Sequence, residues 1–72
     1  MKTYVVKYWD GGGEGEFQEE WDCSSLVKAK RLAIRLAKEK DITMLVDEYD
    51  AEGVCIGIRY WFAYPNGGWK EV

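Results

Sequence analysis

The stretch SSLVKAKRLAIRLAKEK, from Ser24 to Lys40, decides the fold because it carries a sustained helical period. Apolar side chains recur along it at spacings of three, four and one, which places them on one face at about 100° per residue. This face consists of Leu26, Ala29, Leu32, Ala33, Leu36 and Ala37. Alanines at three of these positions keep the face flat, so we expect the helix to dock closely on a sheet.

Both ends of the stretch carry helix-end signals. We expect Ser24 to be the N-cap, because a serine hydroxyl can accept a hydrogen bond from a first-turn N–H. Asp22 suits the positive end of the helix dipole, and Lys38 and Lys40 suit the negative end. Asp41 is expected to follow the helix.

Segments rich in β-branched and aromatic residues flank the helix and predict strands. We expect strands at 3–9, 16–22, 42–49 and 54–64, a short fifth strand at 69–72, and turns at 10–15 (DGGGEG), 50–53 (DAEG) and 65–68 (PNGG). The order β-β-α-β-β-(β) predicts one α+β domain over residues 1–72. Its single helix packs on one face of a four- to five-stranded, mainly antiparallel sheet. Strand 3–9 is placed between strands 16–22 and 42–49, since this keeps neighbouring strands antiparallel.

The sheet face away from the helix has no second layer in this arrangement. Side-chain alternation assigns to it a half-polar, aromatic-bearing set: Val5, Lys7, Trp9, Leu45, Tyr49, Arg59 and Trp61. In strand 54–64 the even positions, which are uniformly apolar, are then left for the helix side. Such an open face could bind a partner or a second copy of the chain, or it could be a solvated amphipathic face.

Charge is segregated along the chain, although the net charge is only −3. Six of the ten basic residues lie between Lys28 and Lys40, and ten of the thirteen acids lie in 10–22 and 47–52. Four basic side chains share the helix face opposite the apolar one and form what we call the basic helix row: Lys28, Arg31, Arg35 and Lys38. The row could contact phosphates or an acidic protein. Ordinary solvation of a helix face explains the same charges, and a pI near 4.9 is unlike that of a general nucleic-acid binder.

The sequence offers little for catalysis. It has no histidine, so the commonest general base and metal ligand is missing. Cys23 and Cys55 lack the spacing of a zinc site and are expected to be free thiols of a cytosolic protein. The DGGGEG segment lacks the Gly-Lys-Ser/Thr ending of a phosphate-binding loop. We therefore expect no enzyme, no cofactor and no metal.

Targeting signals are also missing. No apolar run approaches the roughly 20 residues that span a membrane. The N-terminus leads directly into TYVVKYW without the apolar region and cleavage site of a signal peptide. We expect a cytoplasmic protein that does not associate with membranes.

Two segments carry a resemblance to a known family. The run DCSSLVKAKRLA, from Asp22 to Ala33, is followed by a strand pair and a closing NGGWK, from Asn66 to Lys70. This arrangement resembles small phage-encoded anti-CRISPR proteins and is most similar to those of type I-F. The resemblance covers roughly the last two-thirds of the chain. It implies a small inhibitor, active in the cytoplasm of the host cell, that occupies the nucleic-acid path of a CRISPR effector without catalysis. The acidic first hairpin departs from the lysine-bearing surface of that family, which leaves the target subunit open.

Three functions therefore remain open. The first is a protein-binding inhibitor, which would use the basic helix row, Trp61, or the acidic turns with Asp10, Glu14, Glu16, Asp50 and Glu52. The acidic turns could enter a basic groove that normally holds nucleic acid. The second is a nucleic-acid-binding accessory domain, which would use the basic helix row with Trp9 and Trp61 as stacking platforms. The third is a homodimeric structural protein that associates through the open sheet face.

Overall fold

The computed structural model describes residues 2–9, 20–50 and 55–72, with the side chains of 55–58 left out of the description. The elements in these ranges are β1 (Thr3–Tyr8), β2 (Glu20–Cys23), α1 (Leu26–Lys40), β3 (Met44–Tyr49), β4 (Cys55–Ala63) and β5 (Trp69–Glu71). The expected turn at 10–15, and all but the first residue of the turn at 50–53, fall outside the described ranges. The expected fifth strand is confirmed as β5.

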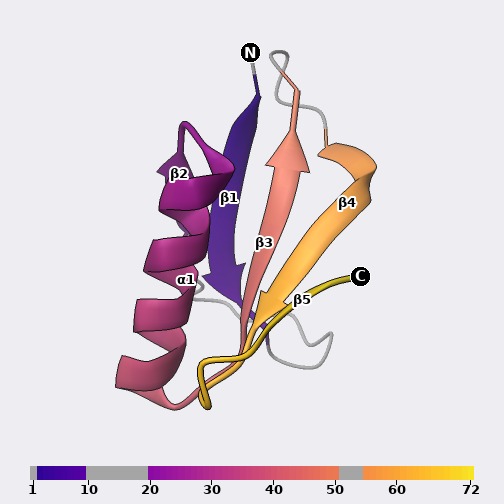
Figure 1. The fold of residues 1–72 in the computed structure, drawn as a ribbon. Coiled ribbons are helices and arrows are strands. Elements are labelled where there is room, and N and C mark those ends of the chain that lie inside the picture. Colours follow the sequence, from indigo (N-terminus) through magenta and orange to yellow (C-terminus); the bar gives the residue numbers. More distant parts are fainter. Residues whose placement is uncertain (1, 10–19, 51–54) are drawn as a thin grey trace.

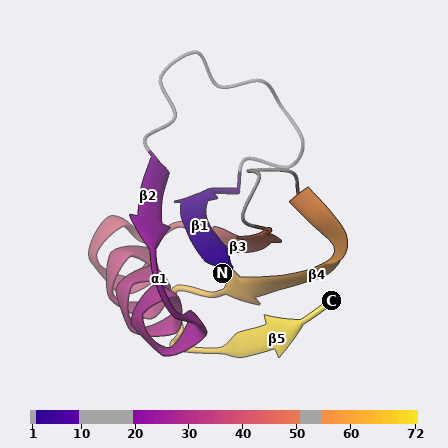
Figure 2. The same ribbon diagram turned by 90° about the horizontal axis from the view of Figure 1, so that it is seen from above.

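The strands form a single sheet in the order β2-β1-β3-β4-β5, with every neighbouring pair antiparallel. The helix α1 lies on one face of this sheet, where it packs mainly against β3 and β1 and less against β2 and β4 (Figure 1). Seen from above, the sheet curves so that β5 lies on the same side as the helix (Figure 2). The predicted α+β architecture is confirmed, as is the placement of β1 between β2 and β3.

The helix begins one residue later than predicted. Ser25, not Ser24, is the N-cap: its backbone is extended, with φ −144°, and its hydroxyl accepts a hydrogen bond from the Lys28 N–H at 3.2 Å. Both serines offer the same hydroxyl, so the sequence alone did not separate them. At the other end Asp41 is the C-cap in a left-handed conformation, φ 52°, and its N–H donates to the Ala37 carbonyl.

The described strand bounds differ from the predicted ones by one or two residues, and positions 16–19 of the predicted second strand lie outside the described residues. The predicted third strand begins at Ile42, but the N–H of this residue donates to the Ala37 carbonyl at 3.2 Å and completes the helix end. The turn between β4 and β5 has the predicted chemistry, because Gly67 takes the left-handed φ of 91°. The side-chain oxygen of Asn66 accepts from the Gly68 N–H at 2.8 Å and fixes the turn.

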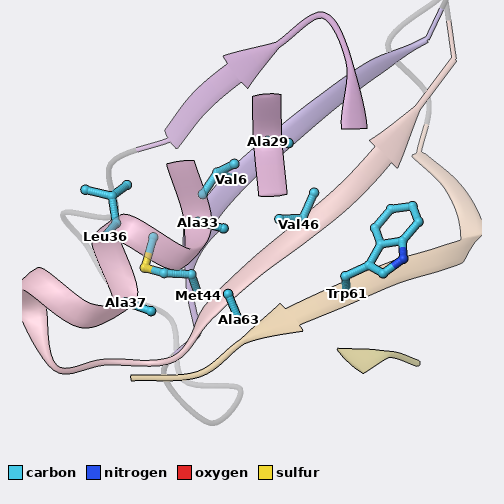
Figure 3. Close-up of a cluster of buried hydrophobic side chains, with 9 residues drawn as sticks. All are labelled: Val6, Ala29, Ala33, Leu36, Ala37, Met44, Val46, Trp61 and Ala63. Carbon is cyan, nitrogen blue, oxygen red and sulfur yellow. The ribbon is translucent and has the colours of Figure 1, made fainter. Parts of the chain in front are cut away.

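The core lies between α1 and the sheet. Ala29, Ala33 and Ala37 are fully buried and face Val6 on β1 and Val46 on β3 (Figure 3). Because these alanines carry single methyl groups, the helix backbone can approach the sheet closely. The full cluster consists of Val6, Ala29, Ala33, Leu36, Ala37, Met44, Val46, Trp61 and Ala63.

The predicted phase of β4 is wrong. Val6 pairs with Val46, and Val46 pairs with Trp61, so Trp61 faces the helix together with Arg59, two residues away. Tyr60 and Phe62 face the open side instead. The prediction failed because β4 carries apolar or aromatic residues on both faces. A register shift in the β3–β4 pairing, between Asp47 and Tyr49, further obscures the alternation.

The remainder of the predicted open face is confirmed. Val5 pairs with Asp47, and Lys7 pairs with Leu45, which in turn pairs with Phe62. These residues therefore share one face, on the side of the sheet away from α1. Val5 and Leu45 are buried even there. The open face is thus not a uniformly solvated surface.

Leu36→Asp is expected to abolish cooperative unfolding. Leu36 is 7% exposed and lies in the helix–sheet core, so the substitution would bury an unpaired carboxylate. That cost exceeds what a marginally stable small domain can absorb. Arg35→Asp, at the neighbouring exposed position, is the matched control and should retain a cooperative thermal transition by circular dichroism. A transition of Leu36→Asp close to the wild type would contradict the assigned helix face.

Asp41→Gly is expected to stabilise the domain by up to about 1 kcal/mol. Glycine adopts the left-handed C-cap conformation without the steric cost that a side chain carries. Asp41→Val should have the opposite effect, because a β-branched residue tolerates positive φ poorly. Urea unfolding of the two variants measures both changes, and an equal response to glycine and valine would contradict a conformational cause.

Candidate interaction surfaces

The outer face of α1 carries the basic helix row. Lys28, Arg31, Arg35 and Lys38 are all exposed, because the opposite side of the helix packs on the sheet (Figure 2). The stem of Lys38 lies against the β4–β5 turn, where a Cβ on Gly67 would come within 3.1 Å of its Cε. Within the part of the chain that the structure describes, no ion pair neutralises the row. With respect to the described residues, the row is therefore a positive surface without an ion-pair partner.

The two other lysines of α1 have different surroundings. The Lys30 ammonium lies 5.4 Å from the centre of the Trp69 ring, and that of Lys40 lies 5.9 Å from the centre of the Tyr8 ring. Both are within the range of cation–π attraction. These two lysines lie over the margins of the helix–sheet core. They are therefore not part of the basic helix row.

The acidic turns are only partly described. Asp10, Glu14, Glu16 and Glu52 lie outside the described ranges. Asp50 directly follows β3, is half-buried and already takes part in an interaction. The acidic turns as a contact surface therefore stay a prediction.

Trp61 cannot serve as a partner contact or a stacking platform, so this prediction is wrong. It is 2% exposed, and its indole N–H donates to Oε1 of Glu71 at 3.0 Å. Its ring lies parallel to that of Trp69, with centroids 6.2 Å apart and an interplanar angle of 12°. The Arg59 guanidinium lies 5.1 Å from the Trp61 ring centre. Trp61 has no ring face left for a nucleobase, and its role is to fill the core beside the helix.

A buried carboxylate lies next to this tryptophan. Glu48 is 1% exposed and accepts a hydrogen bond from the Tyr4 hydroxyl at 2.8 Å on Oε2. Lys2 and Arg59 each approach the same oxygen to 3.8 Å. Burial raises the pKa of the Tyr4 hydroxyl, and the hydrogen bond and charge of Glu48 raise it further. The cluster is a satisfied polar network that closes one end of the core.

Glu48 was not among the residues predicted to be buried or functional. The available signal was alternation, since Met44, Val46 and Glu48 occupy every second position of one strand. That spacing places the carboxylate on the same face as two core side chains. The charge of Glu48 is typical of a solvated position, so the side chain was not expected to point into the core.

An ion pair crosses the open face of the sheet. Lys7 Nζ lies 2.7 Å from Oδ2 of Asp47, and both side chains are largely shielded from solvent. Burial lowers the pKa of Lys7, but the hydrogen bond and charge of Asp47 outweigh this effect and the pKa is raised overall. The pair anchors β1 to β3 on the side away from the helix.

Three aromatic side chains lie beside this ion pair. The ring centroids of Trp9 and Phe62 are 5.2 Å apart at 61°, and those of Tyr60 and Phe62 are 6.2 Å apart at 88°. A pocket of about 420 Å³ opens here, which we call the aromatic pocket; it is lined by Trp9, Leu45, Asp47, Tyr60, Phe62 and Val72. Tyr60 and Phe62 were not predicted on this face, because the expected phase of β4 was wrong. Only the pairing of β3 with β4 could have revealed them.

The basic helix row and the aromatic pocket lie on opposite sides of the sheet. The row is on the outer surface of α1, whereas the pocket is on the face that α1 leaves uncovered. Trp9 is 39% exposed and borders the pocket. The structure therefore does not bring Trp9 and the basic helix row into one surface, as the predicted nucleic-acid-binding arrangement requires.

Cys23 is a free, half-buried thiol at the end of β2. Burial raises its pKa, and the nearby charge of Asp22 raises it further, so the reactive thiolate is disfavoured. Among the described residues no three potential ligands gather as a metal site would need. None of the described helices has the length and apolar character needed to cross a membrane.

Comparisons with protein-family models, with curated proteins and with solved structures find no match to this chain. The residues on which the expected resemblance was based have the following places in the fold. Ser25 caps the helix, Ala29 and Ala33 are buried beneath it, and Trp69 stacks on the buried Trp61. These residues build the framework, and the two surfaces described above are where a partner could bind.

Tyr4→Phe is expected to destabilise the domain by about 1–2 kcal/mol at neutral pH, because a buried carboxylate loses a hydrogen bond. The pKa values of Tyr4 and Lys7 are both raised on folding. Their contributions to stability are therefore complete below about pH 10 and are lost as the pH rises through the folded-state pKa values. Urea unfolding between pH 7 and pH 11 should show a smaller alkaline loss for Tyr4→Phe than for the wild type.

The matched control is Tyr64→Phe, which removes a phenol outside the Glu48 cluster. It should follow the wild type at every pH. Identical alkaline profiles for all three proteins would mean that Tyr4 does not contribute to the pH dependence.

Proposed function

We propose that the chain is a non-enzymatic, protein-binding inhibitor that binds a CRISPR effector complex and occupies its nucleic-acid path. The observation that carries this proposal is the basic helix row. Its four side chains extend over about 15 Å of one helix, at 1.5 Å per residue, and no described acidic residue neutralises them. A row of this kind fits acidic side chains on an effector subunit at the edge of the nucleic-acid path, because the basic lining of the path itself would repel it. Its rigid support limits the entropy lost on binding.

The anti-CRISPR resemblance supports the same function. It implies a serine-capped helix, a following hairpin and a glycine turn that leads into a tryptophan. The Gly-x-x-Trp spacing of that family is not kept here, because Asn66 stands three residues before Trp69. In this chain Ser25 begins the helix, β3 and β4 form the hairpin, and Trp69 follows the closing glycine turn. The agreement concerns architecture, so the function itself is carried over as a proposal.

A nucleic-acid-binding accessory domain has less support. Of the two expected stacking platforms, Trp61 is buried and Trp9 lies on the side of the sheet away from the row. The chain is also acidic overall. Direct binding through phosphates alone would weaken steeply with salt, which separates this function from protein binding.

The proposal is tested with a purified type I-F effector ribonucleoprotein at a fixed salt concentration near 150 mM. Biolayer interferometry measures binding of the chain to the effector, and an electrophoretic mobility shift measures binding of target DNA to the effector. We expect stable association and a stoichiometric loss of DNA binding. Absence of association at micromolar concentrations, or association that leaves DNA binding intact, would refute the proposal.

The double substitution Arg31→Glu/Arg35→Glu is expected to weaken effector binding by about tenfold or more, which corresponds to about 1.4 kcal/mol. Both side chains are exposed, so the thermal transition should stay close to that of the wild type. Lys70→Glu, which reverses an exposed charge on β5 outside the row, is the control and should bind as the wild type does.

Unchanged binding by the double variant would exclude the row as the contact. In that case charge reversal at Asp10, Glu14 and Glu16 tests the acidic turn as the alternative contact. Loss of binding only in that second variant would assign the inhibitor contact to the acidic surface.

A further inference from the structure

The rings of the aromatic pocket are inclined to one another and do not form a parallel stack. The planes of Trp9 and Tyr60 are both steeply inclined to that of Phe62, at 61° and 88°. All three rings line the same pocket on the open face of the sheet. An object seated there would meet aromatic surfaces in more than one orientation.

A carboxylate lies beside these rings in the wall of the pocket. Asp47 lines the pocket, while Lys7, its ion-pair partner, is not part of the lining. Lys7 approaches Oδ2 at 2.7 Å, and a carboxylate can accept several hydrogen bonds on its two oxygens. Leu45 and Val72 supply the remaining, apolar part of the wall.

We propose that the aromatic pocket binds a cationic side chain, lysine or arginine, presented by a protein partner. Aromatic faces attract cations through their quadrupole, and rings that surround a cation together with a carboxylate are a recurring solution for binding it. The long hydrocarbon stem of either side chain would lie against Leu45 and Val72. The inference rests on the proposed function only in taking the cation from a protein.

Charge decides between a cation and an apolar side chain as the occupant. An apolar group seated in the pocket would press hydrocarbon against the Asp47 carboxylate and shield it further from water, which is unfavourable. A cation would instead offer it a second donor. Glu20, which stands opposite Lys7 on β2 and is exposed, adds negative charge to the same face. The pocket therefore favours a cation that competes with Lys7 for Asp47.

Nuclear magnetic resonance of the full chain tests this directly. The protein, labelled with ¹⁵N, is titrated with two short peptides that differ only in one residue, arginine or citrulline. Citrulline has the same shape but replaces the guanidinium by a neutral urea group. We expect saturable shifts of the Trp9 indole and Phe62 amide signals with the arginine peptide. The citrulline peptide should bind at least about fivefold more weakly.

Two substitutions are expected to act in opposite directions. Asp47→Asn should weaken the arginine peptide by about fivefold, because it removes the carboxylate that faces the cation. Lys7→Met should strengthen it by about threefold, because it frees Asp47 from the competing ammonium. Lys28→Met removes the same charge from the far side of the molecule and is the matched control. It separates a local effect of Lys7 from a change in net charge.

Several outcomes would overturn the inference. Equal binding of the citrulline peptide, or a Lys7→Met variant that responds as Lys28→Met does, would mean that the pocket reads apolar shape alone. Shifts of the same signals on simple dilution would identify the pocket as a contact between two copies of the chain. If Asp47→Asn fails to fold, Trp9→Leu takes its place and should weaken the arginine peptide by about fivefold. Because the titration contains no effector complex, its failure is distinguishable from failure of the proposed inhibition.

Discussion

The close approach of α1 to the sheet is the constraint on which the rest of the structure depends. Ala29, Ala33 and Ala37 present only methyl groups to the strands, so the helix settles directly over β1 and β3. In that position the helix contacts β4 less than it contacts β1 and β3. The curved end of the sheet near β4 and β5 must be covered by other side chains. Trp61 and Trp69 fill that space, stacked on one another beside the helix. Much of the aromatic content of this small chain is therefore needed for its core.

The same constraint explains which features the sequence could predict. The helix, its buried face and its basic row all follow from one period of 3.6 residues, and the central position of β1 follows from keeping neighbouring strands antiparallel. The phase of β4 does not follow, because Tyr60 and Phe62 on one face are as apolar as Trp61 on the other. The charge of Arg59 suggested a solvated face of β4. Its guanidinium instead covers Trp61 and approaches Glu48 on the helix side of the sheet.

The two candidate surfaces also differ in how well the sequence could predict them. The basic helix row is local in sequence, so its residues could be identified before the structure was known. The aromatic pocket combines Trp9 at the end of β1, Asp47 on β3 and Phe62 on β4. Those residues meet only through the register of three strands, which the register shift between Asp47 and Tyr49 made unpredictable. Surfaces assembled across strands require the pairing, whereas surfaces along one helix do not.

The separation of the two surfaces constrains how the protein can engage a partner. A sheet and a helix layer lie between them, and packed layers of this kind are about 10 Å apart. One flat partner surface cannot contact both, so a partner either encloses the domain or uses one side. The framework residues Ser25, Ala33 and Trp69 fix this geometry but do not select the partner. In the functions proposed above, selection would depend on the charge of the helix row and on the carboxylate of Asp47. A change of partner would then require substitutions at the surface only, without any change in the core.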